Sequence, residues 1–233
     1  MLTFADKAIH FNKALNYTGA PLPTGIRIMN PFKESEHALQ LTEIFYKKYY
    51  NDHHPRHLIL GINPGRFGAG LTGIPFTDPK RLVSACDISY SGKVTHEPSS
   101  VFIYDMIAAY GGPEIFYKDF YINSPFPLGF TSIDVKGKET NYNYYDSKEL
   151  ILAVSDSILS NIQTLIAMGI QTDVCFCLGT GKNEQFLNKL NTKHHFFKKL
   201  IPLEHPRYIM QYKSTQKQFY IDKYIAAFKE IKH

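Results

Sequence analysis

Three polar side chains that can bind and polarise a substrate stand at the ends of short apolar segments of this chain. Asn63 follows the first such segment and opens a glycine-rich turn, Asn123 ends the second, and His205 follows the last. An asparagine amide carries a donor and an acceptor, so it can orient a water molecule although it cannot remove a proton outright. A neutral histidine has one ring nitrogen that donates a hydrogen bond and one that accepts. These residue types favour a site that holds a polar group beside a water molecule.

A scaffold is needed that brings these segment ends to one place. Four apolar runs predict buried parallel strands, over 57–62, 119–123, 174–178 and 197–203. Helical patterns alternate with them: one starts at Thr3, one covers 34–50, the clearest covers 147–168, and one follows Ser214. This order predicts an α/β fold, a three-layer α/β/α sandwich around a four-stranded parallel sheet. In such a fold the functional site lies beyond the carboxyl ends of the strands.

Turn signals mark the ends of these elements. Asp146 or Ser147 can cap the start of the 147–168 helix, and Gly169 can close its end. Segment 125–145, which mixes prolines and glycines with aromatic residues, is long for a connection inside a compact domain. Such a segment is either a functional loop or a plain surface excursion.

Composition sets the broad class. The chain has 233 residues, a mass of 26.7 kDa and 44% hydrophobic residues, which predicts one domain over 1–233. A formal net charge of +5 permits contact with a polyanion and suits many other proteins equally well.

The cysteines and histidines of the chain do not indicate a metal site. Cys86, Cys175 and Cys177 suit a reduced core, and the histidines show no metal-ligand spacing, so we expect no metal. No signal peptide or membrane span is indicated, and we expect a cytoplasmic, nucleoid-associated monomer.

The glycine-rich turn carries a family signature. The run Leu58-Ile-Leu-Gly-Ile-Asn-Pro-Gly-Arg-Phe-Gly68 is followed by Thr72-Gly-Ile-Pro-Phe76. It resembles the uracil-DNA glycosylase superfamily, in particular the branch of single-strand-selective monofunctional uracil-DNA glycosylases (SMUG). There the motif reads Gly-Met-Asn-Pro-Gly-x-Phe-Gly and continues into Thr-Gly-x-Pro-Phe, and Ile62 replaces the methionine here. Further matches follow in the family's order at 120–123, 178–183 and 203–206, so the resemblance spans about residues 57 to 207.

The resemblance implies a uracil-DNA glycosylase-like fold and an activity. It implies a monofunctional glycosylase of base excision repair, without a cofactor, that hydrolyses the N-glycosidic bond of a deaminated base flipped out of DNA. The departing base becomes an anion while the sugar becomes cation-like, so both need electrostatic support. By the family pattern, Asn63 positions the attacking water, His205 donates a hydrogen bond to the base oxygen, and Phe76 stacks on the base.

Selection of the base is expected to rest on Asn123. Its amide can pair with O4 and N3–H of uracil, whereas cytosine presents the reversed pattern. Hypoxanthine and xanthine show the same edge as uracil, so deaminated purines stay open as substrates. Gly65 stands where other branches carry a bulky residue against thymine's methyl group, so 5-substituted uracils such as 5-hydroxymethyluracil are also expected to fit. Ile62 and Phe67 complete the predicted base-binding set.

The second motif departs from the branch. After His-Pro the branch continues Ser-Pro-Arg-Asn, whereas this chain continues Arg-Tyr-Ile-Met. That segment normally fills the gap left by the flipped base, and Arg207 is the first candidate for this wedge, with Tyr208 and Met210 as alternatives. The predicted DNA contacts are Arg66, Pro206, Arg207, Tyr208 and Lys213.

Two other functions compete with this one. A nucleotide-binding hydrolase is suggested by Gly179-Thr-Gly-Lys182, yet Phe176 and Asn183 occupy the places where a phosphate loop needs glycine and a hydroxyl residue. A module that recognises damaged or single-stranded DNA without cutting it fits the altered second motif, although the presence of both Asn63 and His205 argues against it.

Overall fold

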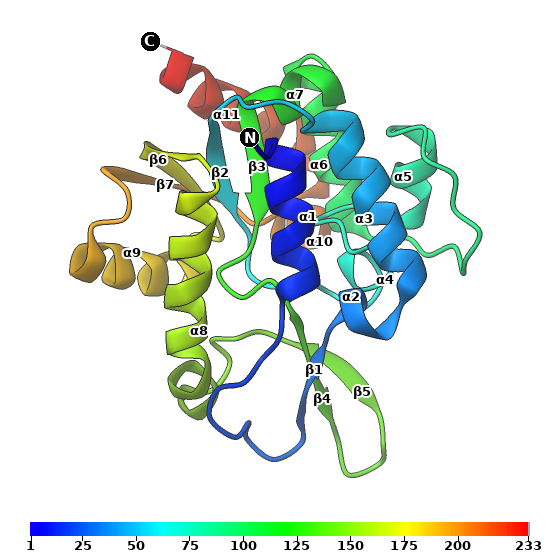
Figure 1. Cartoon of the computed structure of the whole chain (residues 1–233), viewed down its shortest axis with the longest axis vertical. Coiled ribbons are helices and arrows are strands. Elements are labelled where there is room, and N and C mark those ends of the chain that lie inside the picture. Colours follow the sequence, from blue (N-terminus) through cyan, green and yellow to red (C-terminus); the bar gives the residue numbers. More distant parts are fainter. Residues whose placement is uncertain (233) are drawn as a thin grey trace.

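The computed structural model describes residues 1–232 and places a parallel four-stranded sheet at the centre of the chain (Figure 1). All neighbouring strands are parallel, and their order is β3-β2-β6-β7. The predicted strands are confirmed, and the third begins four residues earlier than expected. The strands are β2 (Arg56–Leu60), β3 (Phe120–Asn123), β6 (Ile170–Leu178) and β7 (Lys199–Leu203).

Helices cover both faces of this sheet. Successive side chains of a strand point to opposite faces. The ring of Phe120 lies 4.6 Å from that of Phe228 in α11, whereas the next residue, Tyr121, lies 5.1 Å from Phe4 in α1. The two helices therefore pack on opposite faces, and Figure 1 shows α1 crossing in front of β3. The predicted three-layer sandwich is confirmed. These helices are α1 (Phe4–Ala14) and α11 (Lys217–Lys229).

The longest helix, α8 (Lys148–Ala167), confirms the predicted start and end signals. The Ser147 hydroxyl accepts a hydrogen bond from the Leu150 amide at 3.1 Å, and Gly169 follows the helix at a φ of +115°. By length and composition alone, α8 is the one helix of residues 1–232 that could cross a membrane. Its buried residues are spaced three or four apart on one face, which packs with β6.

The remaining helices surround the carboxyl ends of the strands or cover the sheet. The chain enters β2 from the long helix α3. The helices that next follow β2 and β7, which are α4 and α10, are short. They are α2 (Pro31–Glu34), α3 (Glu36–Tyr49), α4 (Ala69–Thr72), α5 (Pro79–Ser84), α6 (Pro98–Tyr110), α7 (Pro113–Asp119), α9 (Lys182–His194) and α10 (Pro206–Tyr212), with 3-10 turns η1 (Ser214–Gln216) and η2 (Glu230–Lys232).

A second, antiparallel sheet is formed largely by the segment expected to be a long loop. Its order is β1-β4-β5, and it lies at the bottom of Figure 1. Residues 125–145 fold into a hairpin that turns at Gly137, whose φ is +77°. The sheet places β5 next to the turn that follows β2. Its strands are β1 (Ile26–Met29), β4 (Gly129–Ile133) and β5 (Glu139–Tyr142).

Asn183 joins the two sheets at the strand ends. Its buried amide donates to the carbonyls of Gly61 at 3.2 Å and Leu178 at 2.9 Å, and it accepts from the Tyr144 hydroxyl at 2.6 Å. A buried amide with this many partners holds the ends of β2 and β6 and the strand-to-helix loop after β5 together. The glycine-rich turn at 179–182 therefore leads to Asn183, whose role is structural.

Candidate active site

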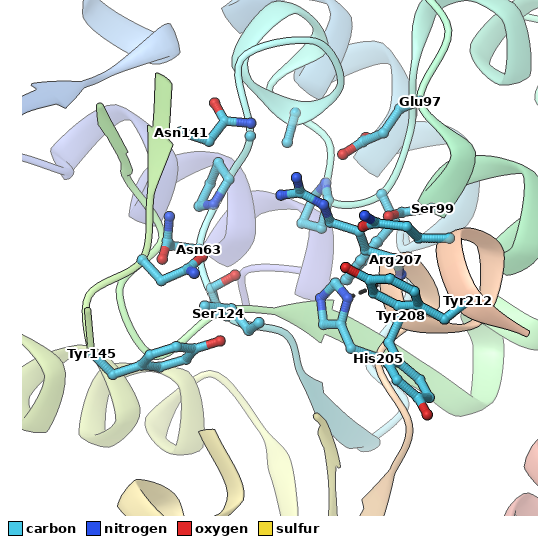
Figure 2. Close-up of a pocket in the computed structure, with 18 residues that line it drawn as sticks. Asn63, Glu97, Ser99, Ser124, Asn141, Tyr145, His205, Arg207, Tyr208 and Tyr212 are labelled. Carbon is cyan, nitrogen blue, oxygen red and sulfur yellow. Dashed lines mark hydrogen bonds between the residues drawn. The ribbon is translucent and has the colours of Figure 1, made fainter. Parts of the chain in front are cut away.

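A cavity of about 270 Å³ opens beyond the carboxyl ends of β2, β3 and β7 (Figure 2). This is where a parallel sheet is expected to bind its ligand. Asn63 and His205, which lie 142 positions apart in the sequence, reach the cavity from opposite sides in Figure 2. Its lining consists of Ile62, Asn63, Pro64, Gly65, Ala69, Pro75, Phe76, Glu97, Ser99, Ser124, Asn141, Asn143, Tyr145, His205, Arg207, Tyr208, Gln211 and Tyr212.

The Asn63 amide is fixed by the backbone at the end of β5 and just after it. Its Nδ2 donates to the Tyr142 carbonyl at 3.0 Å, and its Oδ1 accepts from the Tyr144 amide at 3.1 Å. These opposite partners define which end of the amide carries the nitrogen. Each end keeps one further hydrogen-bonding position, so the side chain can still orient a water molecule or a sugar oxygen in the cavity.

His205 is held as a neutral hydrogen-bond donor. It is the N-cap of α10, and its Nδ1 accepts a hydrogen bond from the Arg207 amide at 3.1 Å. Because Nδ1 accepts, the proton of the neutral ring lies on Nε2. Burial and, second, the positive charge of Arg207 lower the pKa of His205 to about 4. At neutral pH the ring is therefore uncharged and has one N–H to donate.

Phe76 forms an aromatic wall beside this imidazole. Its ring centroid lies 5.6 Å from that of His205, and its backbone adopts a φ of +52°, which is unusual for a residue with a side chain. The Ser100 hydroxyl holds this conformation by donating to the Phe76 carbonyl at 2.6 Å. A Cβ at Gly61 would lie 3.1 Å from the Phe76 ring, so the glycine leaves room for it. Strain of this kind is commonly retained at functional sites.

The wall beside Gly65 is polar. A Cβ at Gly65 would lie 3.4 Å from the Asn141 Nδ2 and 3.5 Å from a carboxyl oxygen of Glu97. The other carboxyl oxygen of Glu97 would be only 1.8 Å from a Cβ at Gly68, so the carboxyl rests on the backbone of the glycine-rich turn. No sequence motif marked Glu97 or Asn141, because each reaches the turn from a separate part of the chain.

A family model described as the uracil DNA glycosylase superfamily matches residues 47–229. The chain belongs to the uracil DNA glycosylase superfamily. A solved structure described as wild-type Pedobacter heparinus SMUG2 is 67% identical, with a TM-score of 0.98 over 100% of this chain and 99% of that one. No curated protein matches. The predicted superfamily and the SMUG-like branch are both confirmed.

Most of the base-binding residues predicted for this superfamily member reach the cavity. Ile62, Gly65 and Phe76 line it together with the two predicted catalytic residues. Phe67 does not: its side chain is 50% exposed, and the Arg66 guanidinium lies 5.0 Å from its ring centre. Its predicted contact with the base therefore needs a movement of the turn.

Asn123 lies behind the cavity wall in this structure. The residue is 3% exposed, its Nδ2 donates to the Tyr121 hydroxyl at 3.0 Å, and its Oδ1 accepts from the Ser124 amide at 2.7 Å. Ser124, which the sequence did not single out, lines the cavity at this strand end. Pairing between Asn123 and a base stays a prediction, and it requires the amide to leave Tyr121.

The predicted DNA contacts divide into two groups. Arg207 and Tyr208 line the cavity, where Figure 2 shows them beside His205. Pro206 is buried as the first residue of α10, Lys213 is half-buried at its end, and Arg66 forms an ion pair with Glu139 at 3.3 Å. These three residues lie outside the lining. The structure adds Tyr145, Gln211 and Tyr212 to it.

The Glu97 carboxyl is expected to make the stability of this superfamily member depend on pH. Burial, then the charge of Asp78, raise the pKa of Glu97 to about 7, from 4.5. A raised pKa in the folded state contributes stability below about pH 4.5 that is lost as the pH rises through about 7. Glu97→Gln, which does not ionise, should therefore lose less unfolding free energy than the wild type between pH 5 and pH 8. Denaturant titrations at both pH values measure this, and equal losses would contradict the assignment.

Proposed function

We propose that this chain is a monofunctional DNA glycosylase that hydrolyses the N-glycosidic bond of a uracil flipped out of DNA, as a step of base excision repair. The observation that carries the proposal is the convergence of Asn63 and His205 on one cavity beside Phe76. Membership of the superfamily supports it independently. The partner is DNA, bound by a monomer in the cytoplasm at the nucleoid. Uracil comes first among the substrates, and 5-hydroxymethyluracil second.

The arrangement suits the charges that develop when this bond breaks. The leaving base gains negative charge on its oxygens, and the Nε2 proton of His205 provides a donor for O2. Because His205 is already neutral, it donates without a proton having to be taken up first. Asn63 orients the water that attacks the sugar carbon, and the proton released by that water passes to solvent. Phe76 stacks on the base and contributes about 1–3 kcal/mol to binding.

Recognition of the base edge falls to the end of β3. Ser124 presents its side chain to the cavity, so its hydroxyl can pair with the base as either donor or acceptor. The predicted pairing by Asn123 becomes available if a bound base draws the amide away from the Tyr121 hydroxyl. A neighbouring pair of polar groups can then reject cytosine, which would leave one of them unpaired.

A deaminated purine is the second candidate substrate. One observation favours it: the space beside Gly65 lacks a side chain and is bordered by the Asn141 amide and the Glu97 carboxyl. A larger base with polar atoms, such as hypoxanthine or xanthine, would meet hydrogen-bonding partners there.

The test is a glycosylase assay on oligonucleotides that carry uracil, 5-hydroxymethyluracil, hypoxanthine or xanthine, each as a single strand and as a duplex. Alkaline cleavage of the abasic product reports excision. We expect uracil to be excised fastest. Faster excision of a purine would reassign the substrate, and tight binding without strand cleavage on any substrate would show a binding module instead of an enzyme.

A further inference from the structure

Two tyrosines of α10 form an exposed aromatic pair at the mouth of the cavity. Tyr208 is 44% exposed and Tyr212 is 65% exposed, and both line the cavity. They lie one helical turn apart, with ring centroids separated by 5.6 Å and ring planes inclined by 46°. Figure 2 shows both beside Arg207 and His205. Large exposed aromatic side chains beside a binding cavity often mark a surface for a partner.

The part of the cavity mouth formed by Tyr208 and Tyr212, called the rim below, has a chemistry that suits a nucleic acid strand. Arg207 precedes the pair in the same helix, and Lys213 follows it directly. Arg207 lines the cavity with the exposed rings, and Lys213 adds a second positive charge at the end of the same helix, which favours contact with a phosphate backbone. A base stacks favourably on an aromatic ring, with little dependence on sequence. A nucleotide whose base occupies the cavity is covalently linked to neighbours that must cross this rim.

We propose that Tyr208 and Tyr212 form a stacking platform for the base next to the flipped nucleotide when the substrate is single-stranded DNA. This inference rests on the proposed glycosylase function. It differs from the wedge predicted for Arg207, because a wedge fills the gap within a duplex, whereas the platform binds a base that has no paired partner.

The platform should distinguish single strands from duplexes. In a duplex, the bases beside the flipped nucleotide remain stacked and paired, so exposing one of their faces costs a few kcal/mol. In a single strand, these faces are free to contact a tyrosine. The ring of Tyr212 therefore strengthens the binding of single strands much more than the binding of duplexes.

The first experiment measures binding by fluorescence anisotropy, with oligonucleotides that carry a non-hydrolysable 2′-fluoro-arabino uracil. Tyr212→Ala should weaken single-strand binding by about fivefold or more, up to about 150-fold, which is the stacking range of about 1–3 kcal/mol. Duplex binding should change by less than about twofold, and Tyr212→Phe should restore single-strand binding. Phe219→Ala is the matched control, since Phe219 is 64% exposed but does not line the cavity.

A second measurement detects the stacking directly. The chain contains no tryptophan, so Tyr212→Trp introduces a single indole fluorophore. Stacking of a base on the indole should quench its emission on addition of the single strand, and a duplex should quench it less. Unchanged emission of Tyr212→Trp on addition of the single strand would overturn the platform, and so would unchanged single-strand affinity of Tyr212→Ala.

The two proposals fail in different ways. If the wild type excises uracil but Tyr212→Ala binds single strands as tightly as the wild type, only the platform is wrong. If the wild type excises no deaminated base, the proposed function fails whatever the tyrosines do. Equal weakening of single-strand and duplex binding by Tyr212→Ala would show a general DNA contact and overturn the strand selectivity claimed for the pair.

Discussion

Replacing His205 with alanine is expected to slow uracil excision about a hundred- to a thousandfold, the usual effect of removing one donor from a developing negative charge. The Nε2 proton is the donor lost, because Nδ1 is occupied by the Arg207 amide. Single-turnover rates with saturating enzyme would measure the chemical step separately from binding. An effect below about tenfold would remove His205 from the proposed chemistry.

The neutral state of His205 can be tested through the pH dependence of the excision rate. A pKa of about 4 means that the imidazole stays neutral between pH 5.5 and pH 8, so its titration should not change the rate over that interval. Since the folded-state pKa lies below the unfolded value, His205 also makes folding less favourable as the pH falls from about 6.5 toward about 4. A wild-type rate that drops through pH 6.5, while the rate of His205→Gln does not, would contradict the neutral donor.

Asn63→Ala is expected to lower the excision rate about a hundredfold or more while the chain stays folded. Positioning errors of about 1 Å in a reacting group have effects of this size, and the alanine leaves the attacking water without its oriented amide. The same single-turnover assay measures the loss.

Asn143→Ala is a suitable control, because Asn143 is another asparagine that lines the same cavity and it lies between the two residues whose main chain holds Asn63. The Asn63 variant also leaves the Tyr142 carbonyl and the Tyr144 amide without this partner. Thermal unfolding should therefore accompany the assay, with a loss of about 1–3 kcal/mol expected for each group left unpaired in a buried position. A near-normal rate in Asn63→Ala would contradict the water-positioning role.

The parallel sheet and the convergence of Asn63 and His205 could be predicted from the sequence because both depend on local patterns. Strands buried on both faces appear as short apolar runs, and polar residues just after them mark the edge where ligands bind. The β1-β4-β5 sheet could not be predicted in this way. Its strands mix apolar with polar residues, and β5 exposes polar side chains, so no continuous apolar run indicates them.

The orientation of Asn123 could have been predicted from the two-residue periodicity of its strand, which the comparison of motifs did not consider. Residues two apart in a strand point to the same face, so Asn123 shares a face with Tyr121, which is buried toward α1. By contrast, nothing local marks Glu97 and Asn141 as neighbours of Gly65. Their contacts join positions that are far apart in the sequence, and only the tertiary structure brings them together.

Asn63 is held by main-chain atoms at the end of the hairpin. This implies that evolution can change side chains in this segment more easily than its length. The Tyr142 carbonyl and the Tyr144 amide are main-chain groups, so they can hold the amide whatever side chain stands at position 142, whereas the Tyr144 side chain is also needed for its bond to Asn183. A single-residue insertion or deletion within the strand is different, because it would invert the pleat and turn both main-chain groups away from Asn63. Homologues should therefore vary in residue type at position 142 but keep the length of β5.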